Sequence, residues 1–235
     1  MIGTGTLVNA AAIAAGGAVG LLFKKGLPER FKSIIFTGSS TAVFFIAVTG
    51  VITAGVTAAE NGLLTSSYML GLLLSLVIGG VIGELLRIDK GIDALAEHLL
   101  KNAKGSSEGF VTATVVFCTG AMAIIGAIND GAQGDPSMLY TKAAIDGITA
   151  LVFASVYGAG VILSAFPILL YQGTITVFAG TIGGLLSQTV INQMSLVGSA
   201  VILLIAFSLW DIKKFNVANM IPAIFMPIVL SFLPL

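Results

Sequence analysis

Charged side chains are scarce in this chain. Its 11 basic and 11 acidic residues make up 9% of 235 residues, whereas an ordinary soluble domain contains about 25%. Apolar residues make up 57%, and the mean hydropathy is +1.05. So few charges cannot cover the surface of a soluble fold or form a basic face for nucleic acid. The composition therefore excludes a soluble globular domain, a disordered chain and a nucleic-acid binder, and it predicts an integral membrane protein.

Cysteine and histidine are almost absent as well. The single cysteine, Cys118, excludes a disulfide framework and a cysteine metal cluster. The single histidine, His98, falls in residues 89–103, where apolar residues at helical spacing predict an amphipathic helix on the cytosolic surface. No histidine at membrane depth is available to activate a nucleophile. We therefore expect no enzyme activity and no cofactor.

Long uncharged stretches divide the chain into membrane spans. A helix needs about 20 apolar residues to cross the bilayer core. Residues 147–210 are long enough for three spans, and Pro167 and the polar stretch 188–193 divide them. The sequence thus predicts an all-α polytopic protein of eight spans, near residues 4–23, 33–55, 63–86, 109–129, 139–163, 167–187, 191–210 and 216–234.

The basic residues predict the orientation of these spans, because lysine and arginine accumulate in cytoplasmic loops. With the N-terminus outside, ten of the eleven basic residues fall in inner loops, and only Lys142 lies outside. We therefore expect a multi-pass protein of a cytoplasmic membrane with both termini external. The uncharged start of the first span argues against a cleaved signal peptide.

Spans one to three and four to six show weak internal similarity in the same order. Thr41 aligns with Thr149, Phe45 with Phe153, and Gly79 with Gly183, at shifts of 104 to 108. Because each copy has an odd number of spans, the second copy must be inverted in the membrane. We predict repeats at residues 1–108 and 109–188, followed by two spans at 189–235 that form a possible partial third copy.

Inverted repeats are a recurring design of secondary transporters, whose site lies between the repeats near the midplane. The sequence therefore favours a carrier for a small polar solute or ion, with a proton or sodium ion as the coupling species. Two alternatives stay open: a passive channel that uses the same residues, and a membrane scaffold that transports nothing. The expected partners are the lipid bilayer, the solute and, through small-residue faces, a second copy in a homodimer.

One carboxylate lies deep within a predicted span, where an ionisable group is costly and by default functional. Asp146 lies about 10 Å below the outer boundary, and its repeat counterpart is the polar stretch 37–41. We predict that Asp146 and Thr149, with Ser40 and Thr41, line a site for the solute or ion. The alternative is that Asp146 only pairs with Lys142, one turn earlier.

Four further polar residues complete the predicted site. Asn129 and Asp130, at the expected outer end of span four, can form an acidic mouth with Asp135 and Asp146 that attracts cations. The alternative for them is an ordinary turn after the helix. Asn9 in span one and Gln172 in span six are either ligand contacts or interhelical hydrogen bonds.

Glycine clusters in the spans predict close helix packing. Gly16 and Gly20 in span one have the four-residue spacing of small-residue packing faces, as do Gly79 and Gly83 in span three. No phosphate-binding loop follows from these glycines, because they lie inside membrane spans.

Several motifs together resemble one known family. They are Gly5-Thr-Leu-Val-Asn9, Leu22-Phe-Lys-Lys-Gly-Leu-Pro-Glu-Arg30, Phe117-Cys-Thr-Gly-Ala-Met-Ala123, Asp130-Gly131, Thr141-Lys-Ala-Ala-Ile-Asp-Gly147 and Leu170-Tyr-Gln-Gly173. They resemble the bacterial integral-membrane family known as domain of unknown function 554, over nearly the whole chain. The resemblance implies a polytopic prokaryotic membrane protein, and it implies no substrate or mechanism.

Overall fold

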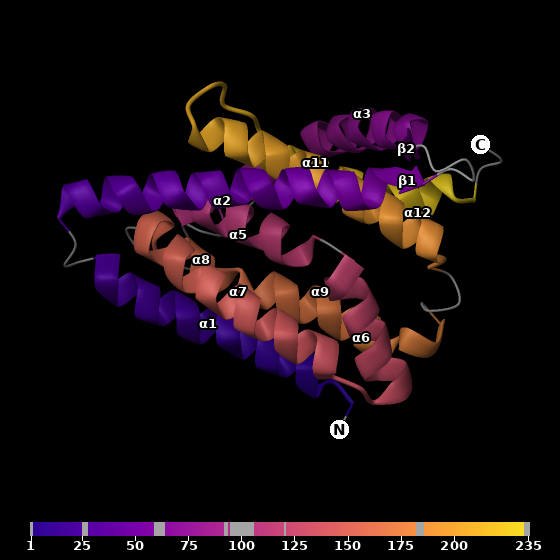
Figure 1. Ribbon diagram of the computed structural model, residues 1–235, viewed down its shortest axis with the longest axis horizontal. Helices are drawn as coiled ribbons and strands as arrows, with labels where there is room; N and C mark the ends of the chain where they lie inside the picture. Colours follow the sequence, from indigo (N-terminus) through magenta and orange to yellow (C-terminus); the bar gives the residue numbers. More distant parts are fainter. Residues whose placement is uncertain are drawn as a thin grey trace. The chain divides into compact units, whose positions relative to one another are not determined.

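The computed structural model describes residues 2–24, 28–58, 64–91, 94, 106–119, 121–181 and 186–232. Apart from one short hairpin, the elements of this part of the chain are helices (Figure 1). In chain order they are α1 (Thr4–Lys24), α2 (Glu29–Gly55), β1 (Val56–Ala58), β2 (Leu64–Ser66), α3 (Met69–Leu86), α5 (Ser106–Cys118), α6 (Ala121–Gln133), α7 (Ser137–Tyr157), α8 (Gly160–Leu163), α9 (Ala165–Val177), α11 (Gln188–Leu209), the 3₁₀ helix η1 (Val217–Phe225) and α12 (Met226–Leu230). The predicted class, an all-α polytopic membrane protein, is confirmed.

Within the described ranges, six helical segments are long and apolar enough to cross a membrane. A seventh results if the bent pair α5–α6 crosses once. The eighth predicted span, near 216–234, corresponds to the shorter apolar helix Val217–Leu230. The count of eight therefore stays a prediction. The six segments are Thr4–Phe23, Ser33–Gly55, Met69–Leu86, Ser137–Tyr157, Gly160–Val177 and Gln188–Leu209.

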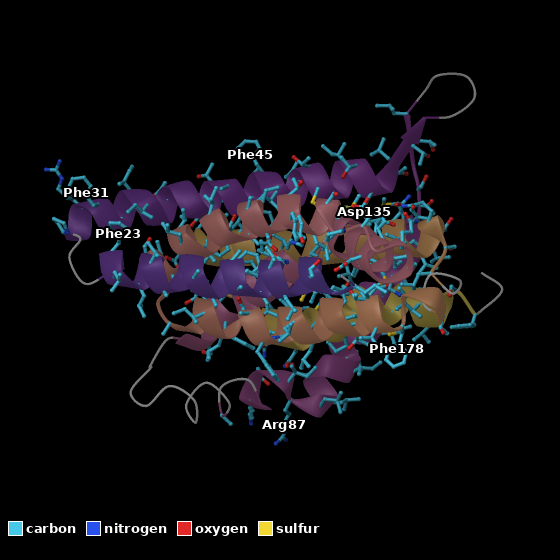
Figure 2. All side chains as sticks on the ribbon, turned by 90° about the horizontal axis from the view of Figure 1, so that it is seen from below. Phe23, Phe31, Phe45, Arg87, Asp135 and Phe178 are labelled. Atoms are coloured by element: carbon cyan, nitrogen blue, oxygen red, sulfur yellow. The ribbon has the colours of Figure 1, made fainter. Side chains whose placement is uncertain are left out.

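Large apolar side chains cover the outer faces of individual helices. Phe45 on α2 is 60% exposed, and Phe178, directly after α9, is 56% exposed (Figure 2). Exposed patches of this kind are avoided at a water interface but suit contact with lipid tails. The exposed phenylalanines thus agree with the membrane class that the composition predicts.

The boundary between two spans in the third quarter of the chain lies earlier than predicted. The helix is interrupted at Ser164, as expected near Pro167, but α8 and α9 on either side of it belong to one apolar segment. The two spans are divided instead at Gly158, whose φ of +87° would be strained for a residue with a Cβ. Gly158 ends α7 at Tyr157, and the next apolar segment is Gly160–Val177.

The fourth predicted span, 109–129, is two helices rather than one. α5 and α6 are bent by 61° relative to each other. The chain between them reads Thr119-Gly120, and both residue types are poor helix formers. Beyond the bend, α6 continues to Gln133, so that Asn129 and Asp130 lie inside a helix and not in a turn after it.

A hairpin replaces the start of the third predicted span. β1 pairs antiparallel with β2, with Thr57 opposite Thr65. The Thr57 and Ser67 hydroxyl oxygens are 2.7 Å apart and share a hydrogen bond. The third span therefore begins at Met69 and not near residue 63.

The chain forms two compact units. The first contains residues Met1–Ser40, Lys90–Cys118 and Met122–Leu185, and the second contains Thr41–Asp89, Thr119–Ala121 and Leu186–Leu235. The repeat division at 1–108, 109–188 and 189–235 stays a prediction. The predicted amphipathic helix, including His98, lies outside the described residues except for 89–91 and 94.

Candidate functional site

Two glycines bring α1 and α7 together in the first unit (Figure 1). A Cβ added to Gly16 would overlap the carbonyl oxygen of Gly147, and one added to Gly20 would overlap that of Leu151. The predicted small-residue face of α1 is thus confirmed as a packing face. Because the two backbones approach so closely, polar side chains one or two turns away are held between the helices.

The first such group is an ion pair within α7. Lys142 Nζ donates a 2.6 Å hydrogen bond to Asp146 Oδ2, one helical turn away. The two residues are only 6% and 4% exposed. Asp146 is the tenth of the 21 residues of α7, which puts it about 14 Å from the start of the helix. The pairing predicted as an alternative is present, deep within a membrane span.

Two amides extend this pair to the neighbouring helices. Asn9 Nδ2 on α1 donates to Asp146 Oδ2 at 3.2 Å and to Gln172 Oε1 on α9 at 3.1 Å. Both amide residues are completely buried. We call Asn9, Lys142, Asp146 and Gln172 the polar cluster. Sequence analysis named three of them as separate candidates, and the structure brings these three together with Lys142.

The direction of the amides follows from the charge of Asp146. A carboxylate accepts hydrogen bonds only, so that Asn9 must turn its NH₂ group toward it. Because the same NH₂ group also contacts Gln172, it is the side-chain oxygen of Gln172 that must face Asn9. Among the described residues, Asn9 Oδ1 and Gln172 Nε2 have no hydrogen-bond partner. The cluster therefore leaves one buried acceptor and one buried donor unsatisfied, which is rare in folded proteins.

The polar contact continues along α1 and α9 by one more turn. The hydroxyl oxygens of Thr6 and Thr176 are 3.1 Å apart and share a hydrogen bond, and both residues are buried. Thr176 was missed because threonine in an apolar span gives no specific signal. Its spacing of four residues from Gln172 is the one indication that the two share a helix face.

Asp130 has a different role from the acidic mouth that was predicted. It is fully buried on α6, and its carboxylate accepts from the backbone N–H groups of Gly3 at 3.1 Å and Gly5 at 3.0 Å. These groups lie at the start of α1, where N–H groups have no partner within the helix and the helix dipole favours a negative charge. Asp130 thus caps a neighbouring helix.

Asp135 lies apart from both buried carboxylates. It is exposed in the loop before α7 (Figure 2). Hydrogen bonds from the side chain and the backbone N–H of Ser137 lower the pKa of its carboxyl group. Asp130, Asp135 and Asp146 each bind their own protein partners, so that the predicted ring of three is not assembled in this structure.

The remaining predicted residues lie outside the polar cluster. The Thr149 hydroxyl bonds to the carbonyl of Ile145 in its own helix. Ser40 is buried and lies near the side chain of Tyr157, at the end of α7 away from Lys142. Thr41 belongs to the second unit. Asn129 is half-buried on α6, and its carbonyl accepts from the N–H of Asp135.

The second unit has a polar network that the sequence did not predict. Asn219 Nδ2 donates to Glu84 Oε2 at 2.7 Å, and its Oδ1 accepts from the N–H of Asp89 at 2.9 Å. Asn216 donates to the Asp89 carboxylate at 2.9 Å. A Cβ on Gly83 would overlap the carbonyl oxygen of Asn219. This network therefore holds η1 against the end of α3, and its residues have a structural role.

A cavity of about 350 Å³ also lies in the second unit, between α3, α11 and α12. Its polar lining comes from Ser187, Thr189, Gln193 and Ser231, and no ionisable side chain lines it. Among the described residues, the buried charged side chains are instead Lys142 and Asp146 of the polar cluster and Asp130. The described residues include no group of three or more histidine, cysteine, aspartate or glutamate residues that fits a metal ion.

Comparisons with known proteins agree with this architecture. The family described as "Protein of unknown function (DUF554)" matches residues 4–232. The chain is 32% identical to "Uncharacterized membrane protein YdfK" of Bacillus subtilis (strain 168) over 228 residues, 97% of this chain and 95% of that protein. It is 30% identical to "Uncharacterized protein YqgA" of Escherichia coli (strain K12) over 236 residues, with the same coverage. No solved structure matches it.

Proposed function

Since the chain belongs to the family of unknown function DUF554, we propose that it is a secondary carrier for a small polar solute or ion across the cytoplasmic membrane. The polar cluster is its binding site, and a proton or a sodium ion is the coupling species. The membrane location rests on the apolar helices and on a relative named as a membrane protein.

The buried ion pair of Lys142 and Asp146 carries this proposal. Removing two charges from water costs several kcal/mol per ion, and apolar side chains of similar volume would stabilise the helix at least as well. Charged groups in spans typically mark ion and substrate pathways. A pair near the middle of α7, with unsatisfied amide groups beside it, is better explained by binding than by stability.

The origin of the cluster residues supports a carrier. Asn9 comes from the first predicted repeat, and Lys142, Asp146 and Gln172 come from the second. In carriers with inverted repeats the substrate binds where the repeats meet, and movement of one repeat against the other opens the site to alternate sides. A cluster of hydrogen bonds between the repeats suits such a site.

An interrupted helix in the first unit supports it further. α5 and α6 are bent by 61° relative to each other, as in a broken span or a re-entrant loop. Helix breaks at membrane depth leave backbone groups unpaired and are tolerated where the chain is buried in protein or lines a cavity. Transporters commonly have such discontinuous helices at their sites.

The test is transport by the full-length protein in proteoliposomes. We expect gradient-driven flux of at least one solute in a panel of cations, anions and neutral metabolites. Asp146→Asn should abolish coupled flux. Thr141→Val is the matched control, because Thr141 lies on the same helix but is exposed and bonds only to the carbonyl of Ser137.

Binding gives a second readout, because a ligand that binds the folded state raises the apparent unfolding temperature. A carrier should be stabilised by at least one panel compound. Folded protein that shows neither flux nor stabilisation over the whole panel would overturn the proposal in favour of a scaffold. Flux that saturates for no solute and needs no coupling gradient would indicate a channel instead.

A further inference from the structure

The polar cluster presents hydrogen-bond donors to a single carboxylate oxygen. Lys142 Nζ, at 2.6 Å, and Asn9 Nδ2, at 3.2 Å, both donate to Asp146 Oδ2. Gln172 Nε2 is a third buried donor and has no partner among the described residues. An ammonium group and amide N–H groups are the groups with which proteins bind anions.

The same geometry disfavours a metal cation at this place. The Lys142 ammonium occupies the position beside Asp146 where a cation would bind. Asn9 also turns its NH₂ group, not its oxygen, toward the carboxylate. A hard cation prefers a shell of several oxygen ligands, and the described residues offer it a positively charged neighbour and donor hydrogens. The carboxylate of Asp146 therefore behaves as the anion already bound in an anion site.

We infer that the cargo is a small monovalent anion, which takes the place of the Asp146 carboxylate on Lys142 when Asp146 accepts one proton. This inference rests on the proposed carrier function. Before binding, the pair Lys142⁺–Asp146⁻ is neutral. After binding, Lys142⁺ pairs with the anion and Asp146 is the neutral acid, so that the site is neutral again. One proton and one anion therefore bind together, with no net charge left in the membrane.

The amides can follow this exchange. A protonated Asp146 has an O–H to donate, and Asn9 Oδ1, which has no partner among the described residues, is the nearby acceptor. A half-turn of the Asn9 side-chain amide points this oxygen toward Asp146 and breaks the hydrogen bond from Asn9 Nδ2 to Gln172 Oε1. Asn9 Oδ1 then accepts from the protonated Asp146, and Gln172 Nε2 is available to donate to the anion. The exchange therefore needs no further polar group.

The titratable groups around Asp146 identify it as the proton acceptor. α7 supplies Lys142, and Cys118 of α5 is close enough to interact electrostatically with both members of the pair. Tyr171 of α9 interacts with Cys118. α1 has no ionisable side chain before Lys24, and Asp130 of α6 is bonded to the start of α1. Asp146 is the carboxylate bonded to the ammonium, so its protonation releases Lys142.

Anion binding to purified protein in detergent tests the inference, with thermal stabilisation as the readout. The probes are acetate and lactate as carboxylates, and chloride and nitrate as inorganic anions. For wild type we expect the affinity for at least one probe to rise about tenfold for each unit that the pH falls, because one proton is taken up. Thr141→Val should behave as wild type.

The decisive variant is Asp146→Asn, for which the two kinds of site predict opposite results. At an anion site the variant leaves Lys142 without its carboxylate, so that the probe should bind about tenfold or more tightly at neutral pH and without pH dependence. At a cation site the same variant loses binding. Lys142→Met should abolish anion binding, and Gln172→Leu should weaken it.

A folding control keeps the test decisive. If Asp146→Asn does not fold, Asp146→Glu retains the charge, and we expect it to keep the pH dependence with a changed anion preference. Loss of anion binding in a folded Asp146→Asn, or anion affinity that is independent of pH in wild type, would overturn the inference. Coupled flux of a cation or a neutral solute would overturn it and leave the carrier proposal standing, whereas absence of any flux or binding would remove both.

Discussion

Asp130 connects two helices through the unpaired backbone groups of one of them. Its carboxylate is fully buried and binds the N–H groups of Gly3 and Gly5. Unsatisfied N–H groups at a buried helix start cost free energy comparable to lost hydrogen bonds. Asp130 therefore sets where α1 begins and keeps Asn9, one turn further, at the level of Asp146.

Replacing Asp130 should destabilise the protein because this cap is lost. We expect Asp130→Ala to lower the free energy of unfolding by about 1–3 kcal/mol, and Asp130→Asn to lower it less, because an amide oxygen still accepts. Asp135→Ala is the control, since Asp135 is exposed. Thermal unfolding in detergent measures the difference. Equal unfolding temperatures for Asp130→Ala and Asp135→Ala would contradict the assigned role.

The buried ion pair gives a second prediction at this scale. Lys142→Met leaves the Asp146 carboxylate buried without its partner, and we expect a loss of about 3–5 kcal/mol at neutral pH. The double variant Lys142→Met/Asp146→Leu removes both charges and should recover most of that stability. A double-mutant cycle of unfolding free energies measures the coupling. Additive single effects would show that the two side chains do not interact in the folded protein.

Sequence reasoning found the members of the cluster but not their arrangement. Asp146 stood out because a carboxylate in a span is costly, and its pairing with Lys142 follows from helix geometry alone. The bonds from Asn9 to Asp146 and Gln172 join residues more than 130 positions apart. They depend on which helices pack together, and no local pattern encodes that.

At the scale of whole elements, glycine spacing determines the closest helix contacts. In the first unit, Gly16 and Gly20 place α1 against α7, and in the second unit Gly79 and Gly83 place α3 against η1. This packing was predictable because only glycine permits such an approach. The boundary between spans was less predictable: Gly158 divides two spans through its positive φ, whereas the interruption at Ser164, before Pro167, lies within one apolar segment.

Two glycine-to-alanine substitutions separate packing from helix propensity. Gly20→Ala adds a Cβ that would overlap the Leu151 carbonyl, so we expect a destabilisation of about 1–3 kcal/mol. Gly38→Ala on α2 meets no heavy atom within 4 Å and should be neutral or stabilising by up to about 1 kcal/mol. Unfolding in detergent compares the two. If both variants are stabilised, the α1–α7 contact is looser than described.

For the whole molecule, composition and charge sufficed to predict the membrane class. The number of crossings depends on two segments, the bent pair α5–α6 and Val217–Leu230. Nine residues of Val217–Leu230 are in a 3₁₀ helix and five in an α-helix. A 3₁₀ helix rises about 2.0 Å per residue, so that the segment extends about 25 Å, nearer to the bilayer core of about 30 Å than 14 α-helical residues would reach.

Reporters at the two termini test the crossing count. Eight spans place both termini on one side, and the lysine and arginine distribution predicts that this side is external. We therefore expect a C-terminal reporter that is active only in the cytosol to be silent, and one that is active only outside to give signal. A cytosolic C-terminus with an external N-terminus would contradict eight spans and indicate an odd number, in which either α5–α6 or Val217–Leu230 does not cross.

The close contact of α1 and α7 has a mechanical consequence for the first unit. Because Gly16 and Gly20 leave no space between the two backbones, these helices can slide or part only if many contacts break at once. Asn9 and Asp146 therefore travel as one body. The bond from Asn9 to Gln172 joins that body to α9, where no pair of α1 glycines brings the two backbones into contact. We therefore expect α9 to move against the α1–α7 pair more readily than α1 moves against α7.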